Sequence, residues 1–290
     1  MLPNIFNIAG KTAIVTGASY GLGATFAEAL AVAGANVVLS ARSKDKLEEV
    51  ALRITDKGGS TLVAPCDVAD AAQVRQMVAD AWQYFGRVDI LVNNAGIAAD
   101  SGIVAEKVPD ELFEQTIQVN LTGVWYCCRE VGARMLGDGK GGSIISIASM
   151  MGLSGQRDLS PSYQASKAAV INLTRNLACS WGDRGVRVNA IAPGWFASEM
   201  TGPLFAMPGF SEWVNGLAAL KRVGDAKELI GPLLFLASDA SSFVTGHTLV
   251  VDGGYSAGIG STSFPDGVYE TLAAGMPNGL GKHILPAKMT

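Results

Sequence analysis

A strand, a glycine-rich turn and a helix follow one another near the start of the chain, and this run constrains the fold more than any other. The apolar segment Thr12–Thr16 leads into Gly17-Ala-Ser-Tyr-Gly21-Leu-Gly23, and an alanine-rich helix is predicted from about Leu22 to Ala33. Glycines let the backbone approach a pyrophosphate, and the unpaired N–H groups of a helix N-terminus attract its charge. The sequence therefore predicts a nucleotide site, although the glycine spacing differs from the commoner Gly-x-Gly-x-x-Gly.

The rest of the chain continues this alternation of short apolar strands with helices. Ala, Val, Leu and Ile dominate, and aromatic residues form only 7% of the chain, which suits parallel strands covered by helices. We therefore predict an α/β fold whose catalytic domain spans residues 1–255. Six further strands are predicted at about 36–40, 61–65, 88–92, 143–147, 186–192 and 246–251.

The charge and the cysteines argue against several classes of protein. With 22 basic and 26 acidic residues the net charge is −4, and no basic stripe suggests a nucleic-acid surface. No apolar run reaches the roughly 20 residues that span a bilayer, and the N-terminus shows no signal peptide. The four cysteines lack metal-ligand spacing, so we expect no metal site and a cytoplasmic protein with reduced thiols.

The end of the second strand predicts which dinucleotide is preferred. An acidic residue here would bind a ribose 2′-OH, but this chain has Ala41 followed by Arg42. A guanidinium can bind a 2′-phosphate, so NADP(H) is favoured over NAD(H). The alternative is that Arg42 is an ordinary solvated charge at a helix start. Asp67, after the third strand, could accept a hydrogen bond from an adenine amino group or serve as a turn residue.

The fourth strand ends in Asn93-Asn94-Ala95-Gly96. These residue types form turns readily, so a plain loop is one interpretation. However, open α/β sheets bind their ligands at the carboxyl ends of the strands. We therefore expect this segment to line the cofactor.

Tyr163 and Lys167 lie four residues apart near the start of a helix predicted over about 162–181, so they share one face. An ammonium beside a phenol would lower the phenol pKa from its usual value near 10. A phenol tuned in this way can exchange a proton with a carbonyl or alcohol oxygen. Most Tyr-x-x-x-Lys pairs lie on an ordinary helix surface. The other motifs of the chain therefore decide whether this pair is catalytic.

Three motifs in order, Thr16-Gly17-x-x-x-Gly21-x-Gly23, Asn93-Asn94-Ala95-Gly96 and Tyr163-x-x-x-Lys167, resemble the short-chain dehydrogenase/reductase family over about residues 9–256. The resemblance implies a single Rossmann-like, doubly wound domain with a seven-stranded parallel sheet and helices on both faces. It implies hydride transfer between NAD(P)(H) and a ketone or secondary alcohol, in a homotetramer or dimer. The residues expected to bind the cofactor are Gly17, Ser19, Tyr20, Gly21, Leu22, Gly23, Arg42, Asp67, Val68, Asn94, Ala95, Gly96, Tyr163, Lys167, Pro193, Gly194 and Ser198.

The resemblance also implies a catalytic group. Ser149, rather than Ser146, matches the family serine three residues before a glycine, and it falls at the carboxyl end of the fifth strand. Ser149 would polarise the substrate oxygen while Tyr163 gives or takes a proton. Lys167 would lower the Tyr163 pKa and bind the nicotinamide ribose. Asn120, within one long helix predicted over about 109–136, matches the family asparagine at a helix kink and would hold a relay water through its backbone. The catalytic residues are thus Asn120, Ser149, Tyr163 and Lys167.

The residues after the sixth strand resemble the family's nicotinamide turn and its variable substrate loop. Ser198 takes the position of a family threonine, ahead of Thr201 as a candidate. The loop holds four large apolar residues, which suit either a lid over an apolar substrate or the core of a short helix pair. Arg157, before Tyr163, is interpreted as solvated rather than as a carboxylate ligand. The apolar residues are Phe205, Met207, Phe210 and Trp213.

Two questions stay open from the sequence. Residues 256–290 extend beyond the usual end of the family and are rich in Gly, Pro and Ser, so we expect them to dock on a neighbouring subunit or to be partly disordered. The substrate is also open: a 3-oxoacyl-carrier-protein reductase and a sugar-alcohol dehydrogenase are alternatives. A dinucleotide-binding regulator without turnover is a third, which the intact catalytic group argues against.

Overall fold

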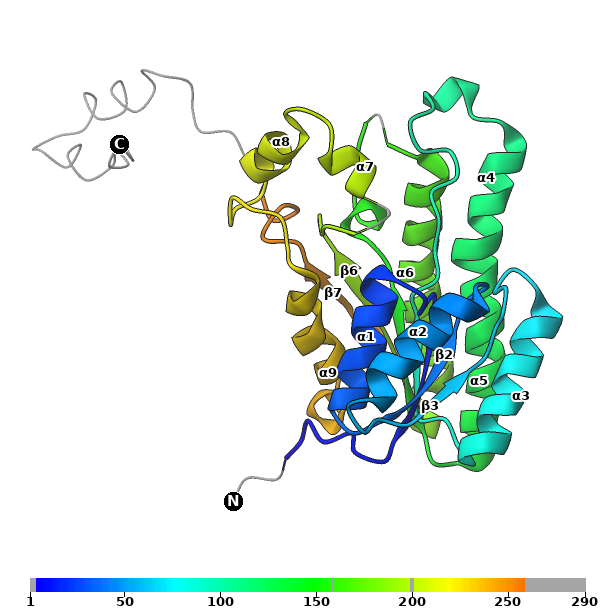
Figure 1. Cartoon of the computed structure of the whole chain (residues 1–290). Helices are drawn as coiled ribbons and strands as arrows, with labels where there is room; N and C mark the ends of the chain where they lie inside the picture. The colour runs from blue at the N-terminus through cyan, green and yellow to red at the C-terminus, as the bar shows by residue number, and fades with distance from the viewer. Residues whose placement is uncertain (1–3, 158, 199–200, 259–290) are drawn as a thin grey trace, which may run out of the picture.

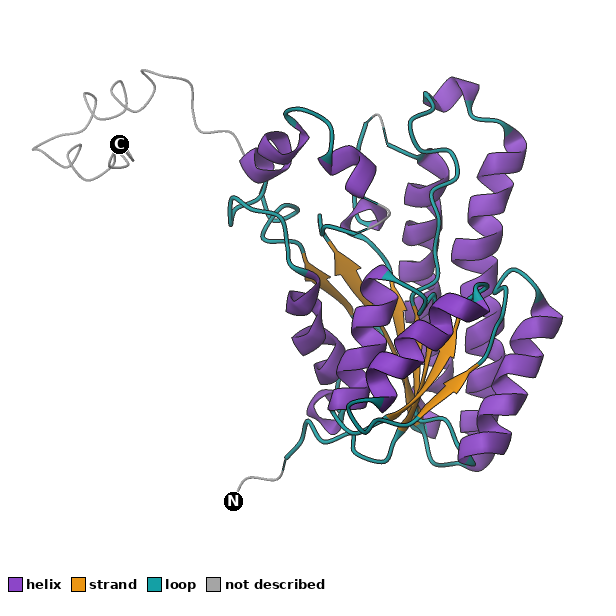
Figure 2. Ribbon diagram, in the orientation of Figure 1, coloured by secondary structure: helices purple, strands orange, loops and turns teal. Residues whose placement is uncertain are grey.

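The computed structural model describes residues 4–157, 159–198 and 201–258, which form a three-layer α/β domain (Figures 1 and 2). Seven parallel strands make one sheet in the order β3-β2-β1-β4-β5-β6-β7, which confirms the predicted sheet. The strands are β1 Thr12–Thr16, β2 Asn36–Ser40, β3 Thr61–Val63, β4 Ile90–Asn93, β5 Gly142–Ile147, β6 Val186–Pro193 and β7 Thr248–Val251.

Helices cover both faces of the sheet, so the strands are apolar on both sides. In β1, Ile14 packs against one layer of helices while Ala13 and Val15 pack against the other. One layer is α1 Gly21–Val32, α2 Lys44–Thr55 and α9 Ile230–Ala237. The other is α3 Ala71–Phe85, α5 Gly123–Asp138 and α6 Pro161–Trp181.

The glycine turn after β1 lies where the strand order reverses. β1 pairs with β2 on one side and with β4 on the other, so the segments that follow β1 and β4 lie side by side. The Asn94 Nδ2 group joins them by donating to the carbonyls of Thr16 at 3.1 Å and Gly17 at 3.2 Å. Gly17 has φ of 66°, and a Cβ there would lie 2.8 Å from the Ala95 Cα. This close crossing therefore requires glycine.

The single helix predicted over 109–136 is wrong in one respect, because a π-helical turn divides it. The elements are α4 Asp110–Ile117, the π turn η2 Gln118–Thr122 and α5. Asn120 lies in the π turn and is fully buried. A π turn places an extra residue in the helix, and it directs the Asn120 amide at a neighbouring loop. The resemblance implied a kink at Asn120, but the helical pattern did not predict the π turn, because local sequence does not reveal that distant partner.

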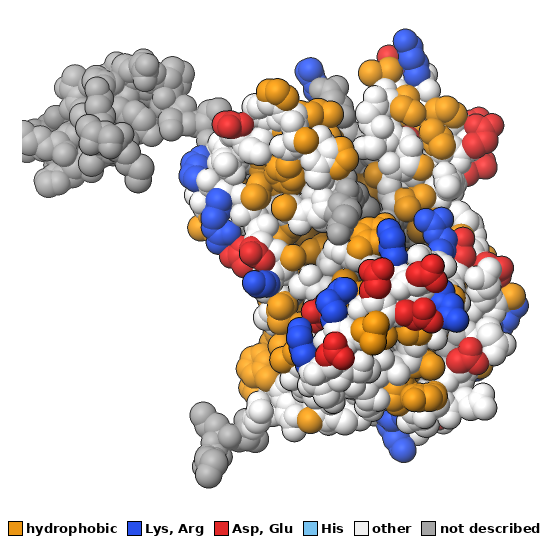
Figure 3. Space-filling model, viewed as in Figure 1, with side chains coloured by type: hydrophobic (Ala, Val, Ile, Leu, Met, Phe, Trp, Pro, Cys, Tyr) orange, Lys and Arg blue, Asp and Glu red, His pale blue; other side chains and the backbone are white. Residues whose placement is uncertain are grey.

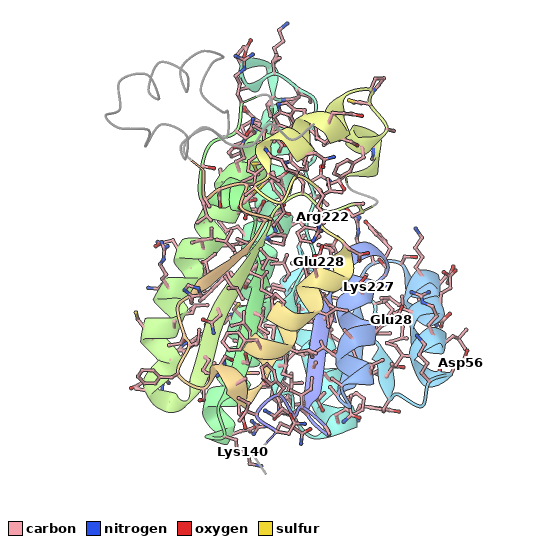
Figure 4. All side chains as sticks on the ribbon, turned by 90° about the vertical axis from the view of Figure 1, so that its left-hand side faces the viewer. Glu28, Asp56, Lys140, Arg222, Lys227 and Glu228 are labelled. Carbon is pink, nitrogen blue, oxygen red and sulfur yellow. The ribbon has the colours of Figure 1, made fainter. Side chains whose placement is uncertain are left out.

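The chain between β6 and α9 forms its own small structure above the carboxyl edge of the sheet (Figure 1). It contains α7 Gly202–Phe205 and α8 Phe210–Leu217 and returns to the sheet through a 3₁₀ turn, η5 Ala226–Leu229. Arg222 donates to both Glu228 carboxylate oxygens at 2.7 Å, and Figure 4 shows the two residues next to each other near the middle of the molecule. The remaining 3₁₀ turns are η1 Ala105–Lys107, η3 Met150–Gly152, η4 Gly182–Arg184 and η6 Asp239–Ser241.

Most of the C-terminal extension expected at 256–290 lies outside the described residues. Among the residues that the structure describes, no helix combines the length and the apolar composition needed to cross a membrane.

We expect two glycines of α5 to respond oppositely to alanine. A Cβ at Gly123 would lie 2.9–3.1 Å from Val68, including its carbonyl oxygen, whereas a Cβ at Gly137 would meet nothing within 4 Å. Gly123→Ala should lower the unfolding free energy by ~1–3 kcal/mol through overpacking. Gly137→Ala should raise it by ~0.5–1 kcal/mol, because alanine favours the helix. Denaturant titration of both variants tests this, and equal effects would contradict the packing.

Candidate active site

One cavity of about 640 Å³ runs along the carboxyl edge of the sheet. It is lined by all the residues predicted to bind the cofactor and by Ser149. Asn120 is the one predicted site residue that does not line it. Residues that the sequence reasoning did not single out also line the cavity: Ser43, Lys46, Cys66, Ile97, Val119, Ile147, Ala148 and Phe196.

The end of the cavity at α1 fits a pyrophosphate. Tyr20 is the N-cap of α1 and makes no side-chain capping bond, and the first turn holds no acidic residue. The first N–H groups of the helix are therefore free of side-chain acceptors and can bind an anion. A Cβ on Gly23 would lie 2.1 Å from the Gly17 carbonyl oxygen, so the turn packs as closely as such a cradle requires. These residues fit a dinucleotide.

The end of the cavity beyond β2 is basic. Arg42 and Lys46 line it, and the Lys46 ammonium lies 5.4 Å from the centre of the Tyr20 ring. Asp67 is the one carboxylate among the described residues that line the cavity, and its Oδ1 accepts from Ala69 N at 3.0 Å. Lys46 lies in the first turn of α2, four residues after Arg42, which precedes the helix.

Ser149 and Ser146 have different surroundings. Ser149 is the N-cap of η3, where its Oγ accepts from Met151 N at 3.1 Å, and it lines the cavity. Ser146 is buried in β5 and accepts from Asn93 Nδ2 at 3.3 Å. A Cβ on Gly152 would lie 2.6 Å from the Lys167 carbonyl carbon, so η3 packs directly on α6. Ser149 thus lies beside the helix that carries Tyr163.

The prediction that Lys167 lowers the Tyr163 pKa is wrong for the arrangement in the structure. Burial raises the pKa of the Tyr163 phenol, and a hydrogen bond with Ser149 only partly opposes this. The Lys167 ammonium lies 5.5 Å from the centre of the Tyr163 ring and donates instead to the Ile147 carbonyl at 2.6 Å. The ammonium is therefore close to the ring but committed to another acceptor.

Lys167 is a buried cation, with only 4% of its surface exposed. Desolvation lowers its pKa from 10.5 to about 8. A Cβ at Gly96 would lie 3.5 Å from the Lys167 Nζ, an ordinary contact, and 3.3 Å from the Asn120 Oδ1, a tight one. Lys167 and Asn120 therefore meet the same glycine.

The Asn120 side-chain amide does not line the cavity but links two segments that do. Its Oδ1 accepts from Ile97 N and its Nδ2 donates to Ile97 O, both at 2.8 Å. Nδ2 also donates to Ser166 Oγ at 3.1 Å. The side chain thus binds the loop after β4 to the helix residue that precedes Lys167.

Asp100 is a buried residue that the sequence reasoning missed. Its carboxylate accepts from Ser162 N at 3.1 Å, from Ser162 Oγ at 2.6 Å and from Ser160 Oγ. Burial raises the Asp100 pKa, but the hydrogen bonds from the two serines outweigh this and leave it below its usual value. Asp100 therefore fixes the N-terminus of α6, where Ser160 also caps Tyr163 N at 3.1 Å. The two serines at the start of the helix, Ser160 as its N-cap and Ser162 in its first turn, were the available signal.

Four aromatic rings meet where the chain leaves β6. The Trp195 ring makes edge contacts with Phe210 at 5.2 Å, Phe205 at 6.3 Å and Trp213 at 6.4 Å, measured between ring centres. Figure 3 shows hydrophobic side chains gathered over α7 and α8. Nearby, Ser198 and Thr201 both line the cavity and share a hydrogen bond of 3.1 Å.

The cysteines are free thiols, three of them buried, and burial raises the pKa of Cys66 to about 11. Within the ranges that the structure describes, no group of three His, Cys, Asp or Glu side chains could hold a metal ion.

Comparison with known proteins assigns this geometry to a family. Residues 17–256 match the family described as Enoyl-(Acyl carrier protein) reductase. The chain is 37% identical to gluconate 5-dehydrogenase of Gluconobacter oxydans, covering 89% of this chain and 99% of the relative. It is 40% identical to a 3-oxoacyl-[acyl-carrier-protein] reductase of Synechocystis, covering 85% and 97%. A gluconate 5-dehydrogenase of Burkholderia cenocepacia, solved with NADP and tartrate, superposes with a TM-score of 0.84 at 36% identity, covering 88% and 99%.

Lys167→Met is expected to raise the unfolding free energy of the protein at neutral pH by ~1–2 kcal/mol, because it removes a buried cation while losing one hydrogen bond. Between about pH 8 and 10.5 the folded wild type binds fewer protons at Lys167 than the unfolded chain. Wild-type stability therefore rises with pH across this window, and the difference between the two proteins shrinks.

Denaturant titration at neutral pH and at about pH 10 measures this difference. Lys140→Met is the control, because Lys140 is an exposed lysine at the opposite end of the molecule (Figure 4). A wild type that is more stable than Lys167→Met at neutral pH would overturn the argument.

Proposed function

The chain belongs to the short-chain dehydrogenase/reductase family, and from this membership we propose which residues carry its reaction and which cofactor it prefers. The protein is an NAD(P)-dependent oxidoreductase that transfers hydride between a nicotinamide cofactor and a ketone or secondary alcohol. The observation that carries the residue assignment is the convergence of Ser149, Tyr163 and Lys167 on the cavity that also holds the uncapped end of α1.

Tyr163 is the proton donor in ketone reduction. The raised pKa keeps its phenol protonated at neutral pH, which is the form needed to protonate the developing alkoxide. The Ser149 hydroxyl, hydrogen-bonded to Tyr163, donates to the same substrate oxygen and stabilises its charge. When bound, the nicotinamide supplies the hydride.

Lys167 restores the phenol proton and binds the cofactor ribose. Its ammonium has a pKa of about 8, so it can release a proton near neutral pH. Three donor hydrogens let it keep the Ile147 carbonyl while reaching the phenol or a ribose hydroxyl. Asn120 acts through the backbone of its π turn, which holds the relay water, because its side chain is already committed to Ile97 and Ser166.

The preferred cofactor is NADP(H). Arg42 and Lys46 line the cavity beyond β2, where a 2′-phosphate would lie. The structure of the Burkholderia relative, solved with NADP, supports the same preference.

The assembly is a homotetramer or dimer, in a cytoplasmic setting. Large apolar side chains exposed on α4 and α5, Phe113 and Trp125, support burial by a second copy. Four free thiols support a reducing compartment. The catalytic domain spans residues 1–255 in this proposal, and the extension of residues 256–290 that follows it lies mostly outside the described residues.

Tyr163→Phe should keep NADPH binding and lower turnover by about 100-fold or more, because the ring stays while the acidic hydroxyl is lost. NADPH oxidation followed by absorbance, with a separate measurement of NADPH affinity, tests this. Tyr84→Phe is the matched control, since Tyr84 is exposed on α3. Turnover by Tyr163→Phe close to that of the wild type would refute the assignment of Tyr163 as the proton donor, whereas absence of turnover in the wild type itself would favour a regulator.

Arg42→Ala should raise the KM for NADPH by about tenfold or more and leave the KM for NADH unchanged, because only NADPH presents a charge for the guanidinium. Lys44→Ala is the control, since Lys44 pairs with Glu48 at 3.5 Å and does not line the cavity. Equal changes in KM for NADPH and for NADH would show that Arg42 does not bind the 2′-phosphate.

A further inference from the structure

Tyr163, the proposed proton donor, lies in the first turn of α6, where a helix is held least by its own hydrogen bonds. Ser160 is the N-cap and Pro161 is the first helical residue, so Tyr163 occupies the third helical position. The first N–H groups of a helix have no acceptor within the helix, and helix ends fray. A proton donor, however, must be held within about 0.5 Å of its productive position. The first turn of α6 therefore needs support from outside the helix.

The first three helical positions of α6 leave no N–H group without an acceptor. Pro161 has no N–H group to satisfy. Ser162 N donates to Asp100 Oδ2 at 3.1 Å, and Tyr163 N donates to Ser160 Oγ at 3.1 Å. The start of α1 differs, because its N-cap makes no side-chain bond. One helix start is thus free to bind an anion, while the other is closed by residues of this chain.

The Asp100 carboxylate organises both of these bonds. It is fully buried, and it also accepts from the hydroxyls of Ser160 and Ser162. A serine hydroxyl has a single proton to donate, and Ser160 donates it to Asp100. The lone pairs of the Ser160 oxygen are thereby left to accept from Tyr163 N. Asp100 thus acts on Tyr163 through one intervening hydroxyl.

The segment that carries Asp100 is held at other points by other residues. Ile97, which lines the cavity, is bound to the Asn120 amide at both of its backbone groups, at 2.8 Å. Ala99 N donates to Thr116 Oγ1 at 3.2 Å. The cavity wall at Ile97 therefore has its own anchor, whereas the start of α6 is bound to this segment through Asp100.

We propose that Asp100 is a positioning residue for the reaction: its carboxylate fixes the Ser160 hydroxyl and the first turn of α6, so that the Tyr163 phenol meets the substrate oxygen. This rests on the proposed function, in which the Tyr163 proton goes to that oxygen while hydride adds to the carbonyl carbon. Asp100 acts indirectly, since it does not line the cavity. An asparagine in its place keeps the shape but loses the charge and one acceptor oxygen.

Asp100→Asn should lower kcat by about tenfold or more, because a displaced phenol transfers its proton poorly, and should change KM for NADPH by less than about twofold. The assay follows NADPH oxidation with whichever compound the wild type reduces fastest among cyclohexanone, cyclohexane-1,2-dione, 5-dehydrogluconate and an acetoacetyl thioester. The ratio of kcat in ordinary water to kcat in heavy water should increase, since proton transfer becomes the slower step. A loss of folded protein alone would lower kcat without changing this ratio.

Ser160→Ala removes the hydroxyl through which Asp100 acts. It should lower kcat in the same way as Asp100→Asn. The double variant should lose no more than the larger of the two single losses, as expected for residues that act as a unit. Single losses that multiply in the double variant would overturn the proposal, because Asp100 would then act by another route.

Asp70→Asn is the matched control, because it makes the same chemical change at another helix N-cap. Asp70 caps α3, accepts from Ala72 N at 2.7 Å and does not line the cavity. The control should lower the urea concentration at the unfolding midpoint without lowering kcat. A kcat of Asp100→Asn equal to that of the wild type would overturn the inference and leave the proposed function intact.

Hydrogen exchange provides a measurement that needs no substrate. The amides of Ser162 and Tyr163 should exchange faster in Asp100→Asn than in the wild type, and at the wild-type rate in Asp70→Asn. Unchanged exchange of these amides in Asp100→Asn would overturn this inference alone. If the wild type reduces none of the four compounds faster than Tyr163→Phe does, the proposed function fails together with this inference.

Discussion

A buried amide, Asn120, holds together the segments that form the reactive edge of the sheet. It binds both backbone polar groups of Ile97 in the loop after β4 and reaches Ser166 on α6. A buried polar group without its partner costs roughly 1–3 kcal/mol, so the helix forms a π turn that keeps these bonds. The position of the loop and the depth of Lys167 are therefore fixed by the same contact.

The reactive edge keeps two buried charges that the rest of the fold must stabilise. Lys167 is desolvated beside Ile147, and the Asp100 carboxylate is enclosed by the first turn of α6. Asp100 gains from the helix N-terminus and three hydrogen bonds, whereas Lys167 has one acceptor and a lowered pKa. The apolar layers on both faces of the sheet provide the free energy that offsets this local cost.

The sequence predicted the elements that local chemistry determines. Buried parallel strands appear in the sequence as apolar runs. The turn after β1 is recognised by its glycines, and the structure shows why glycine is needed there, because no side chain fits at Gly17. The members of the site also follow from motifs, and all of them except Asn120 line one cavity. Properties set by distant partners did not follow. The π turn depends on Ile97, the role of Asp100 depends on serines sixty residues away, and the raised Tyr163 pKa depends on how deeply the ring is buried.

The catalytic group and the aromatic cluster lie in separable parts of this fold. Ser149 caps η3, directly after β5, and Tyr163 and Lys167 lie on α6. The aromatic cluster stands on the excursion between β6 and η5, and its rings pack mainly on one another. That excursion is anchored at its ends, where Gly194 packs on Asp252 and Arg222 pairs with Glu228. Its interior can therefore change without moving the proton donor.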